Sequence, residues 1–171
     1  MKKNYKNINF NVIFIFIVII GFFLRYLNNF DQIFWNDENY TLFITEPSTS
    51  LKEFLKRHKT LDESPVIYFY ILKLYNHVFY SSEFLRFSSI IFSTLTILVS
   101  YKFFKVFFEK KESLFCVFLI ALNIFLIWQS KEARIASSVI FFGLINILIF
   151  YKYLLKDNFK NRLSLFLINL F

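Results

Sequence analysis

Long apolar runs separated by short polar segments dominate the chain. The runs cover about 8–27, 87–108, 113–129 and 135–155, and a further run extends from 163 to the last residue, 171. A helix needs about 17–25 mostly apolar residues to cross the hydrocarbon core of a bilayer. The pattern therefore predicts an all-α, polytopic membrane protein with four transmembrane helices and the start of a fifth.

The first run could be mistaken for a secretory signal peptide, because three lysines precede it: Lys2, Lys3 and Lys6. A signal peptide ends in a small-x-small cleavage site. Here the nearly unbroken apolar part of the run, 8–24, is followed by Arg25, Tyr26 and Leu27, which do not form such a site. The run is therefore expected to be an uncleaved anchor.

One long segment, 28–86, lies between the first two apolar runs. The capping-box pattern of Ser50 and Glu53 predicts a short helix through Arg57. Ser64 followed by Pro65 predicts the cap and the first residue of a second helix. Apolar residues of that second helix recur at helical spacing, as is typical of a helix that lies in the membrane interface; they are Ile67, Tyr70, Ile71, Leu74 and Val78.

The composition agrees with a membrane protein. Hydrophobic residues make up 57% of the chain and aromatic residues 23%, whereas a soluble domain has roughly 45–50% apolar residues on a count that includes glycine. The single Cys excludes a disulfide scaffold and a four-thiolate metal site. With only two histidines in addition, the sequence does not indicate a metal centre.

The net charge of +8 comes from the segments on one side of the expected membrane topology. With the N-terminus inside, the inside segments carry eleven Lys or Arg against three acids, and the outside segments carry nine of each. This bias predicts a cytoplasmic N-terminus and places 28–86 outside, as an extracytoplasmic loop that carries interfacial helices. The chain is therefore expected to be a multi-pass protein of a cell membrane, namely the cytoplasmic membrane of a bacterium. Membrane lipid is the expected partner, and nucleic acid is not.

Asp37 and Glu38 are the leading candidates for chemistry. They lie just beyond the first apolar run, between Trp35 and Tyr40. Carboxylates in such surroundings can have raised pKa values and act as general bases. Adjacent positions of a helix point about 100° apart, so only one of the two can face a given substrate if the segment is helical. The alternative is a solvated acid pair or a charge at a helix N-terminus.

Three other charged residues are weaker candidates. Asp62 could be a further site acid or could compensate a helix N-terminus. Glu132 and Arg134 lie in a short turn between two apolar runs, where charges are costly unless they are paired or functional. The planar fork of Arg134 suits a phosphate, and interface anchoring is the alternative for both. Glu83 and Arg86 are spaced for an i,i+3 ion pair.

Taken in order, four segments resemble the GT-C glycosyltransferases, specifically the protein O-mannosyltransferase-like and aminoarabinose-transferase-like membrane enzymes. The segments are Trp35–Glu38, Asp62–Tyr70, Ser82–Ser89 and Trp128–Arg134. Three places depart from the pattern of the subfamily, namely Val66, Phe87–Ser88 and Ile135–Ala136.

The resemblance implies a glycosyltransferase that moves a sugar from a polyprenyl-phosphate-linked donor to an acceptor glycan, lipid or protein on the extracytoplasmic face, with inversion. Asp37 would be the general base and Glu38 would support the site. Arg134 would neutralise the donor phosphate, Glu132 would orient groups nearby, and Asp62 would join them at the donor. No cofactor is required by the pattern, and dependence on a divalent cation stays open.

The length leads to a further expectation, because the members of this superfamily have many more spans. We expect a truncated reading frame or fragment, inactive unless a second polypeptide supplies the rest. The competing interpretation is a small multispan membrane protein without catalysis, such as an accessory subunit or a transport component. The second to fourth apolar runs lack central charges, which disfavours a transporter.

Overall fold

The computed structural model describes residues 9–27, 33–78 and 81–155, together with Ser164 and Ile168. Within these residues the chain forms eight α-helices and no β-strand, which confirms the all-α class. The helices are α1 (Phe10–Tyr26), α2 (Asn36–Ile44), α3 (Leu51–Leu61), α4 (Val66–Asn76), α5 (Ser82–Phe104), α6 (Lys110–Ala121), α7 (Ile124–Gln129) and α8 (Ala136–Leu155).

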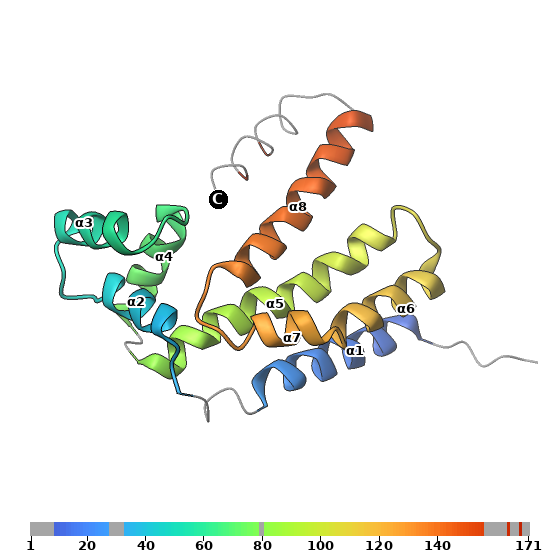
Figure 1. Cartoon of the computed structure of the whole chain (residues 1–171). Helices are drawn as coiled ribbons and strands as arrows, with labels where there is room; N and C mark the ends of the chain where they lie inside the picture. Colours follow the sequence, from blue (N-terminus) through green and yellow to red (C-terminus); the bar gives the residue numbers. More distant parts are fainter. Residues whose placement is uncertain (1–8, 28–32, 79–80, 156–163, 165–167, 169–171) are drawn as a thin grey trace, which may run out of the picture.

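The helices form two groups (Figure 1). The long group consists of α1, α5, α6, α7 and α8, with α5 in contact with each of the other four. The short group, α2 to α4, packs together at the end of the molecule where α5 begins. The C-terminal end of α1 and the connection from α7 to α8 lie at this same end. Loops that are far apart in the sequence can therefore meet there.

Close packing holds α1 against α5 and α6. A buried cluster joins the three helices, and its members are Ile17, Ile97, Leu114, Val117 and Ala121. Gly21 allows this approach, because a Cβ at that position would collide with the Ile97 Cδ1 and lie 3.3 Å from the Ala121 Cβ. One face of α5 is buried and made of small polar residues, as in helices that pack within membranes: Ser88, Ser89, Ser93, Thr96 and Ser100.

Among the residues that the structure describes, two helices are long and apolar enough to cross a membrane, namely Phe84–Phe104 within α5 and α8 at Ala136–Leu155. At 1.5 Å per residue, the 23 residues of α5 extend about 34 Å, against a hydrocarbon core of about 30 Å. The apolar helix α1 is shorter, with 17 residues. The predicted start of a fifth span, 163–171, lies outside the described residues except for Ser164 and Ile168.

The observed helices differ from two of the predicted apolar spans in where they begin and end. The run 113–129 is not one helix, because the Asn123 side chain accepts a hydrogen bond from the Leu126 N–H at 3.0 Å and starts α7 there. The carbonyls at the end of α6 bind the guanidinium of Arg25, which is fully buried and donates to the Ala121 carbonyl at 3.0 Å. The run 87–108 begins its helix earlier, at Ser82, because Ser81 caps it, and the helix ends earlier, at Phe104.

The segment 33–78 contains the two predicted helices and one more. The Ser50 hydroxyl accepts from the Glu53 N–H at 3.2 Å, which confirms the predicted cap, although α3 continues to Leu61. The predicted cap at Ser64 is wrong by one residue, because Pro65 is the N-cap of α4 and the Ser64 N–H is held by Asp62. Most of the apolar face predicted for α4 is exposed, and the residues concerned are Tyr70, Ile71, Leu74 and Val78.

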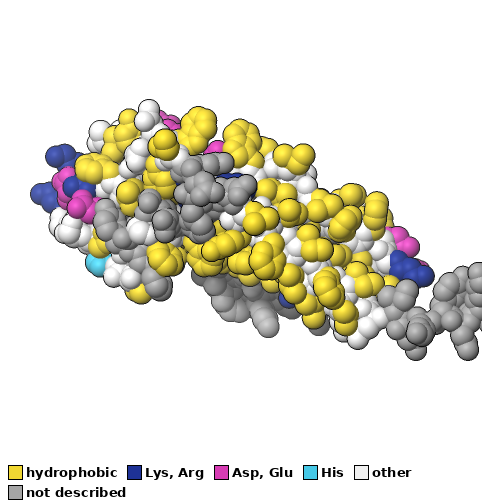
Figure 2. All heavy atoms as spheres, turned by 90° about the horizontal axis from the view of Figure 1, so that it is seen from below, with side chains coloured by type: hydrophobic (Ala, Val, Ile, Leu, Met, Phe, Trp, Pro, Cys, Tyr) yellow, Lys and Arg dark blue, Asp and Glu magenta, His cyan; other side chains and the backbone are white. Residues whose placement is uncertain are grey.

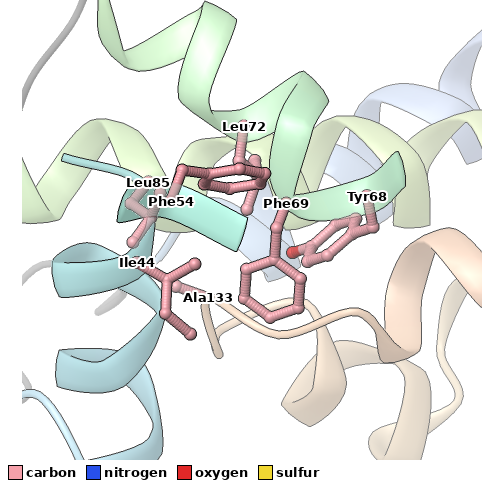
Figure 3. Close-up of a cluster of buried hydrophobic side chains, with 7 residues drawn as sticks. All are labelled: Ile44, Phe54, Tyr68, Phe69, Leu72, Leu85 and Ala133. Atoms are coloured by element: carbon pink, nitrogen blue, oxygen red, sulfur yellow. The ribbon is translucent and has the colours of Figure 1, made fainter. Parts of the chain in front are cut away.

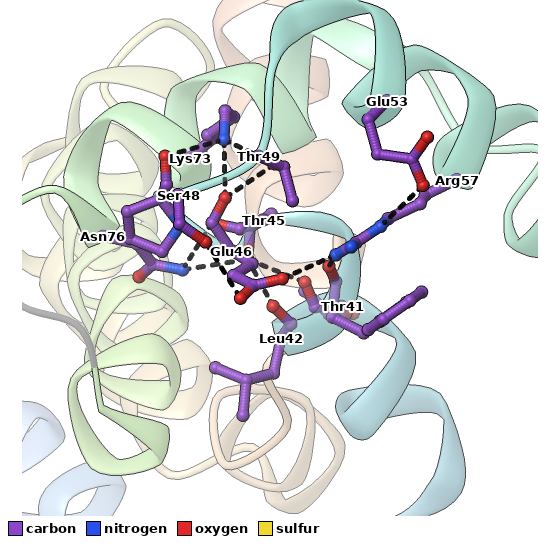
Figure 4. Close-up of polar contacts among 12 residues, drawn as sticks. Thr41, Leu42, Thr45, Glu46, Ser48, Thr49, Glu53, Arg57, Lys73 and Asn76 are labelled. Carbon is purple, nitrogen blue, oxygen red and sulfur yellow. Dashed lines mark hydrogen bonds and ion pairs between the residues drawn. The ribbon is translucent and has the colours of Figure 1, made fainter.

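The short group has its own core and its own polar network. Figure 3 shows the core, formed by Ile44, Phe54, Tyr68, Phe69, Leu72, Leu85 and Ala133. On the polar side, Lys73 donates to the Pro47 carbonyl at 3.2 Å and to the Thr49 hydroxyl at 2.7 Å (Figure 4). Arg57 donates to the carboxylates of Glu46 at 2.7 Å and Glu53 at 3.2 Å. These contacts fix α2, α3 and α4 relative to one another.

The surface suits a membrane environment. On the face shown in Figure 2, hydrophobic side chains cover the middle of the molecule, and charged side chains gather mainly at its two ends. Many large apolar residues of the long helices are exposed, for example Ile15, Phe16 and Phe23 of α1 and Phe115 and Leu119 of α6. Soluble monomers rarely expose continuous apolar surface of this extent.

Candidate functional site

The four sequence segments singled out above meet at the end of the molecule that carries α2 to α4. Trp35 to Glu38 begins α2, and Asp62 follows the last turn of α3. Arg86 lies in the second turn of α5, and residues 130–135 connect α7 to α8. Contacts between these segments, described below, join side chains that are up to 97 positions apart in the chain.

Asp37 and Glu38 point in different directions from the first turn of α2. The side chain of Asp37 is 66% exposed, whereas that of Glu38 is 1% exposed. The Glu38 carboxylate turns back and accepts a hydrogen bond from the Trp35 N–H at 3.1 Å, which satisfies one of the free amides at the helix start. The expected division therefore holds, with one carboxylate facing outward and the other facing the core.

Glu38 forms a buried, two-pronged ion pair with Arg86. The Arg86 Nε lies 2.8 Å from one carboxylate oxygen and the Nη2 lies 2.7 Å from the other. The Ala133 N–H donates to the first of these oxygens at 2.7 Å. Arg86 also donates to the Ile33 carbonyl at 3.2 Å, and its guanidinium lies over the ring of Phe34. The pair connects the start of α2, the start of α5 and the 130–135 connection.

Arg134 lies between the two aspartates. Its Nη1 donates to the Asp62 carboxylate at 3.2 Å, and its Nη2 lies 3.8 Å from the Asp37 carboxylate. Asp62 is nearly buried and also accepts the Ser64 N–H at 2.7 Å, so its orientation is fixed from two sides. The Arg134 side chain is 29% exposed. This arrangement presents one edge of the Arg134 guanidinium and the exposed Asp37 carboxylate to the outside.

Glu132 and Tyr68 complete the surroundings. Burial raises the pKa of the Glu132 carboxyl, and the negative charge of Glu38 acts in the same direction. Burial also raises the pKa of the Tyr68 hydroxyl, which lies beside Ser89 without a standard hydrogen bond to any described group. Ser89 in turn donates to the Arg134 carbonyl at 3.4 Å. Both groups are therefore held in their neutral forms more strongly than in water.

The structure brings together four of the five predicted site residues through ion pairs or hydrogen bonds: Asp37, Asp62 and Arg134 in one set, and Glu38 in a second set that is joined to the first through Ala133. Glu132 lies close enough to this group that the charges of Glu38 and Arg134 act on the pKa of its carboxyl. Their roles in a reaction stay predictions. Among the described residues, no group of three or more His, Cys, Asp or Glu is arranged to hold a metal ion.

Arg86 was missed as a functional candidate. Its spacing from Glu83 predicts a local pair, but the structure gives Arg86 a partner 48 positions away in Glu38; the side chain of Glu83 lies outside the described ones. One signal was available, because Arg86 stands at the edge of an apolar run, where a charge needs a partner. The pairing of Arg86 with Glu38 could be found only from the fold.

Comparison with known families gives a match. The family model described as dolichyl-phosphate-mannose-protein mannosyltransferase matches residues 63–169, which is more than half of the chain. The match includes Arg86, Glu132 and Arg134, and it begins after Asp37, Glu38 and Asp62. No curated protein and no solved structure matched the chain.

Proposed function

Because this chain belongs to the dolichyl-phosphate-mannose-protein mannosyltransferase family, we propose that it transfers a sugar from a polyprenyl-phosphate donor to a hydroxyl group of an acceptor. The family consists of membrane glycosyltransferases of the GT-C type, and the long apolar helices α5 and α8 agree with a membrane location. Acceptors of the family are proteins or glycans.

The observation that carries this proposal is the pairing of Asp37 with Arg134. An exposed carboxylate lies 3.8 Å from a guanidinium nitrogen, and both face the same end of the molecule. Transfer from a phosphate-linked donor needs a group that accepts the proton of the acceptor hydroxyl and a cation that stabilises the departing phosphate. Asp37 and Arg134 supply these two groups side by side.

The reaction then follows as a single displacement. The Asp37 carboxylate takes the proton from the acceptor hydroxyl while the oxygen forms a bond to the anomeric carbon of the sugar. The bond between that carbon and the phosphate oxygen breaks, and the polyprenyl phosphate leaves with the bonding electron pair. Attack opposite to the leaving group inverts the anomeric configuration.

The geometry of Arg134 fits the role of a phosphate ligand. Its Nη1 is already held by Asp62 at 3.2 Å, whereas the Nη2 is too far from Asp37, at 3.8 Å, for a hydrogen bond. Asp62 therefore fixes the direction of the guanidinium and leaves the second nitrogen available. A phosphate oxygen that approaches Nη2 would also lie close to Asp37, where the acceptor hydroxyl must bind.

The orientation in the membrane is part of the proposal. Lys102, Lys105, Lys110 and Lys111 lie at the end of α5 and the start of α6, opposite the end that carries the site. An excess of Lys and Arg favours the cytoplasmic side. The N-terminus and this turn would then be cytoplasmic, and Asp37 and Arg134 would face the extracytoplasmic side of the cell membrane.

A transfer assay with membranes that contain the full chain tests this function. A radiolabelled polyprenyl-phosphate sugar and an acceptor mixture of proteins and glycans are supplied, and labelled acceptor and released polyprenyl phosphate are measured. We expect release to depend on the acceptor and Arg134→Lys to raise the KM for the donor, because the ammonium cannot keep the bond to Asp62 and also bind phosphate. Lys131→Arg, on the neighbouring position, serves as the control. Absence of transfer by the unmodified chain, both alone and together with a second polypeptide that supplies the further spans of the family, would favour the competing interpretation, a membrane protein without catalysis.

A further inference from the structure

We propose that Arg86 is a positioning residue for this transfer. Through the Glu38 carboxylate it holds the 130–135 connection, and with it Arg134, at a fixed distance from Asp37. The inference rests on the proposed function for its catalytic consequence. Its structural part, that Arg86 fixes the position of the connection, can be tested without any activity.

The carboxylate of Glu38 is the point where three chain segments are joined. It accepts hydrogen bonds from its own segment at Trp35, twice from Arg86 on α5, and from the Ala133 N–H on the 130–135 connection. All four contacts lie between 2.7 and 3.1 Å. Arg86 binds both oxygens of the carboxylate and so prevents it from rotating. The oxygen that accepts from the Ala133 N–H is therefore held in one place.

Chain neighbours carry this constraint to the candidate site. Asp37 precedes Glu38, and Arg134 follows Ala133. The hydrogen bond of 2.7 Å between Glu38 and the Ala133 N–H therefore limits how far Asp37 and Arg134 can move apart. Their charged groups lie 3.8 Å from each other. Misplacement of a reacting group by about 1 Å can cost on the order of a hundredfold in rate.

Arg86 acts at a distance from any ligand. Its side chain is 2% exposed, with the Phe34 ring on one face of the guanidinium and the Ile33 carbonyl at one nitrogen. A substrate cannot reach it without opening the site. Its planar fork matches the two oxygens of Glu38, a geometry that a lysine ammonium does not reproduce.

Arg57 provides a matched control. It too binds a carboxylate, at 2.7 Å from Glu46, donates to a backbone carbonyl at Phe43, and lies over an aromatic ring. These contacts join α2 to α3 and involve no residue of the 130–135 connection. Loss of either arginine removes a similar set of contacts, but only loss of Arg86 should affect the spacing of Asp37 and Arg134.

The first experiment compares turnover. Arg86→Gln, Arg86→Lys and the matched Arg57→Gln and Arg57→Lys are assayed in membranes for polyprenyl-phosphate-sugar transfer, with rates divided by the amount of folded protein. We expect kcat to fall roughly 10- to 100-fold in both Arg86 variants, with a small change in the KM for the donor, and to stay near that of the unmodified chain in the Arg57 variants. Added guanidinium should restore part of the kcat of Arg86→Gln.

The second experiment measures the connection itself. Lys131→Cys is introduced together with Cys116→Ala, and the rate of labelling by a membrane-impermeant maleimide is recorded in three backgrounds: unmodified, Arg86→Lys and Arg57→Lys. We expect faster labelling only with Arg86→Lys. Unchanged labelling in that background would overturn the inference, whether or not kcat falls, because Arg86 would then not hold the connection. Faster labelling with an unchanged kcat would equally overturn it. If the unmodified chain transfers no sugar, the proposed function fails, and labelling still decides the structural part.

Discussion

Replacing Glu38 by glutamine is the sharpest test of how the candidate site is held together. Glutamine has nearly the same shape, but it has no charge and replaces one oxygen by an NH₂ group. Each carboxylate oxygen of Glu38 accepts two hydrogen bonds, one from Arg86 and one from a backbone N–H. Whichever oxygen is replaced, an N–H donor then faces two other donors.

The expected loss of stability is large because both partners are buried. The Glu38 and Arg86 side chains are 1% and 2% exposed, so the guanidinium cannot recover water when its carboxylate is lost. Removing one partner of a buried pair costs about 3–5 kcal/mol. Total stabilities of folded domains are about 5–15 kcal/mol. The substitution should therefore remove a large part of the stability of the end of the molecule that carries the site.

Intrinsic tryptophan fluorescence is a suitable assay. The sequence has two tryptophans, Trp35 and Trp128, and both lie in segments that border the candidate site. Unfolding of the purified protein in a mild detergent, followed by titration with a denaturing detergent, should show an earlier transition for Glu38→Gln. The control is Glu46→Gln, which weakens a more exposed pair with Arg57 and should change the transition far less. A Glu38→Gln transition within about 1 kcal/mol of the unmodified chain would show that the buried pair with Arg86 does not stabilise this end of the molecule.

Three further predictions concern packing, a buried amine and pH. Gly21→Ala should destabilise the protein by about 1–3 kcal/mol, because α5 and α6 leave no room for a Cβ. Gly143→Ala should not destabilise it, because no atom lies within 4 Å of the added Cβ. Thermal unfolding of the two variants tests this difference. Lys73→Met should lower the melting temperature by a few degrees, since it removes hydrogen bonds to the Pro47 carbonyl and the Thr49 hydroxyl; an unchanged melting temperature would contradict this. Burial raises the pKa of Glu132 above 4.5, so the folded state binds this proton more tightly than the unfolded state does. The folded state therefore loses stability as the pH rises from 4.5 through the raised pKa. Glu132→Gln should lack that part of the decline, and pH-dependent unfolding that is identical in the two proteins would exclude it.

The fold class and the approximate position of the long helices could be predicted from the sequence, because apolar runs of sufficient length leave few alternatives. The boundaries could not, because they depend on single capping side chains. Ser81 starts α5 five residues before the apolar run, and Asn123 divides the third run into α6 and α7. The buried Arg25 that binds the carbonyls at this break was likewise not expected, since its partners are backbone groups of another helix.

In the candidate site, too, local features could be predicted from the sequence and contacts between distant residues could not. Helical geometry predicts that Asp37 and Glu38 face different ways, but only packing decides which one is buried. Local spacing predicts a pair of Arg86 with Glu83, whose side chain lies outside the described ones, but it does not predict the observed pair of Arg86 with Glu38, 48 positions away. A contact of this kind is created by the arrangement of α2 and α5, and a single sequence contains no spacing rule for it. The sequence leaves Asp62 open between two roles, and in the structure its carboxylate contacts both Arg134 and the Ser64 N–H, so its role at the site stays a prediction.

The most direct test of the account is the transfer rate of Asp37→Asn. The variant keeps the size of the side chain but cannot accept a proton, and general-base catalysis contributes about 10²–10⁴-fold to a rate. Glu63→Gln, an exposed acid beside Asp62, is the control. With a polyprenyl-phosphate sugar as donor, the account predicts that kcat of Asp37→Asn falls by at least about a hundredfold while Glu63→Gln keeps the rate of the unmodified chain. Equal rates for Asp37→Asn and the unmodified chain would contradict it.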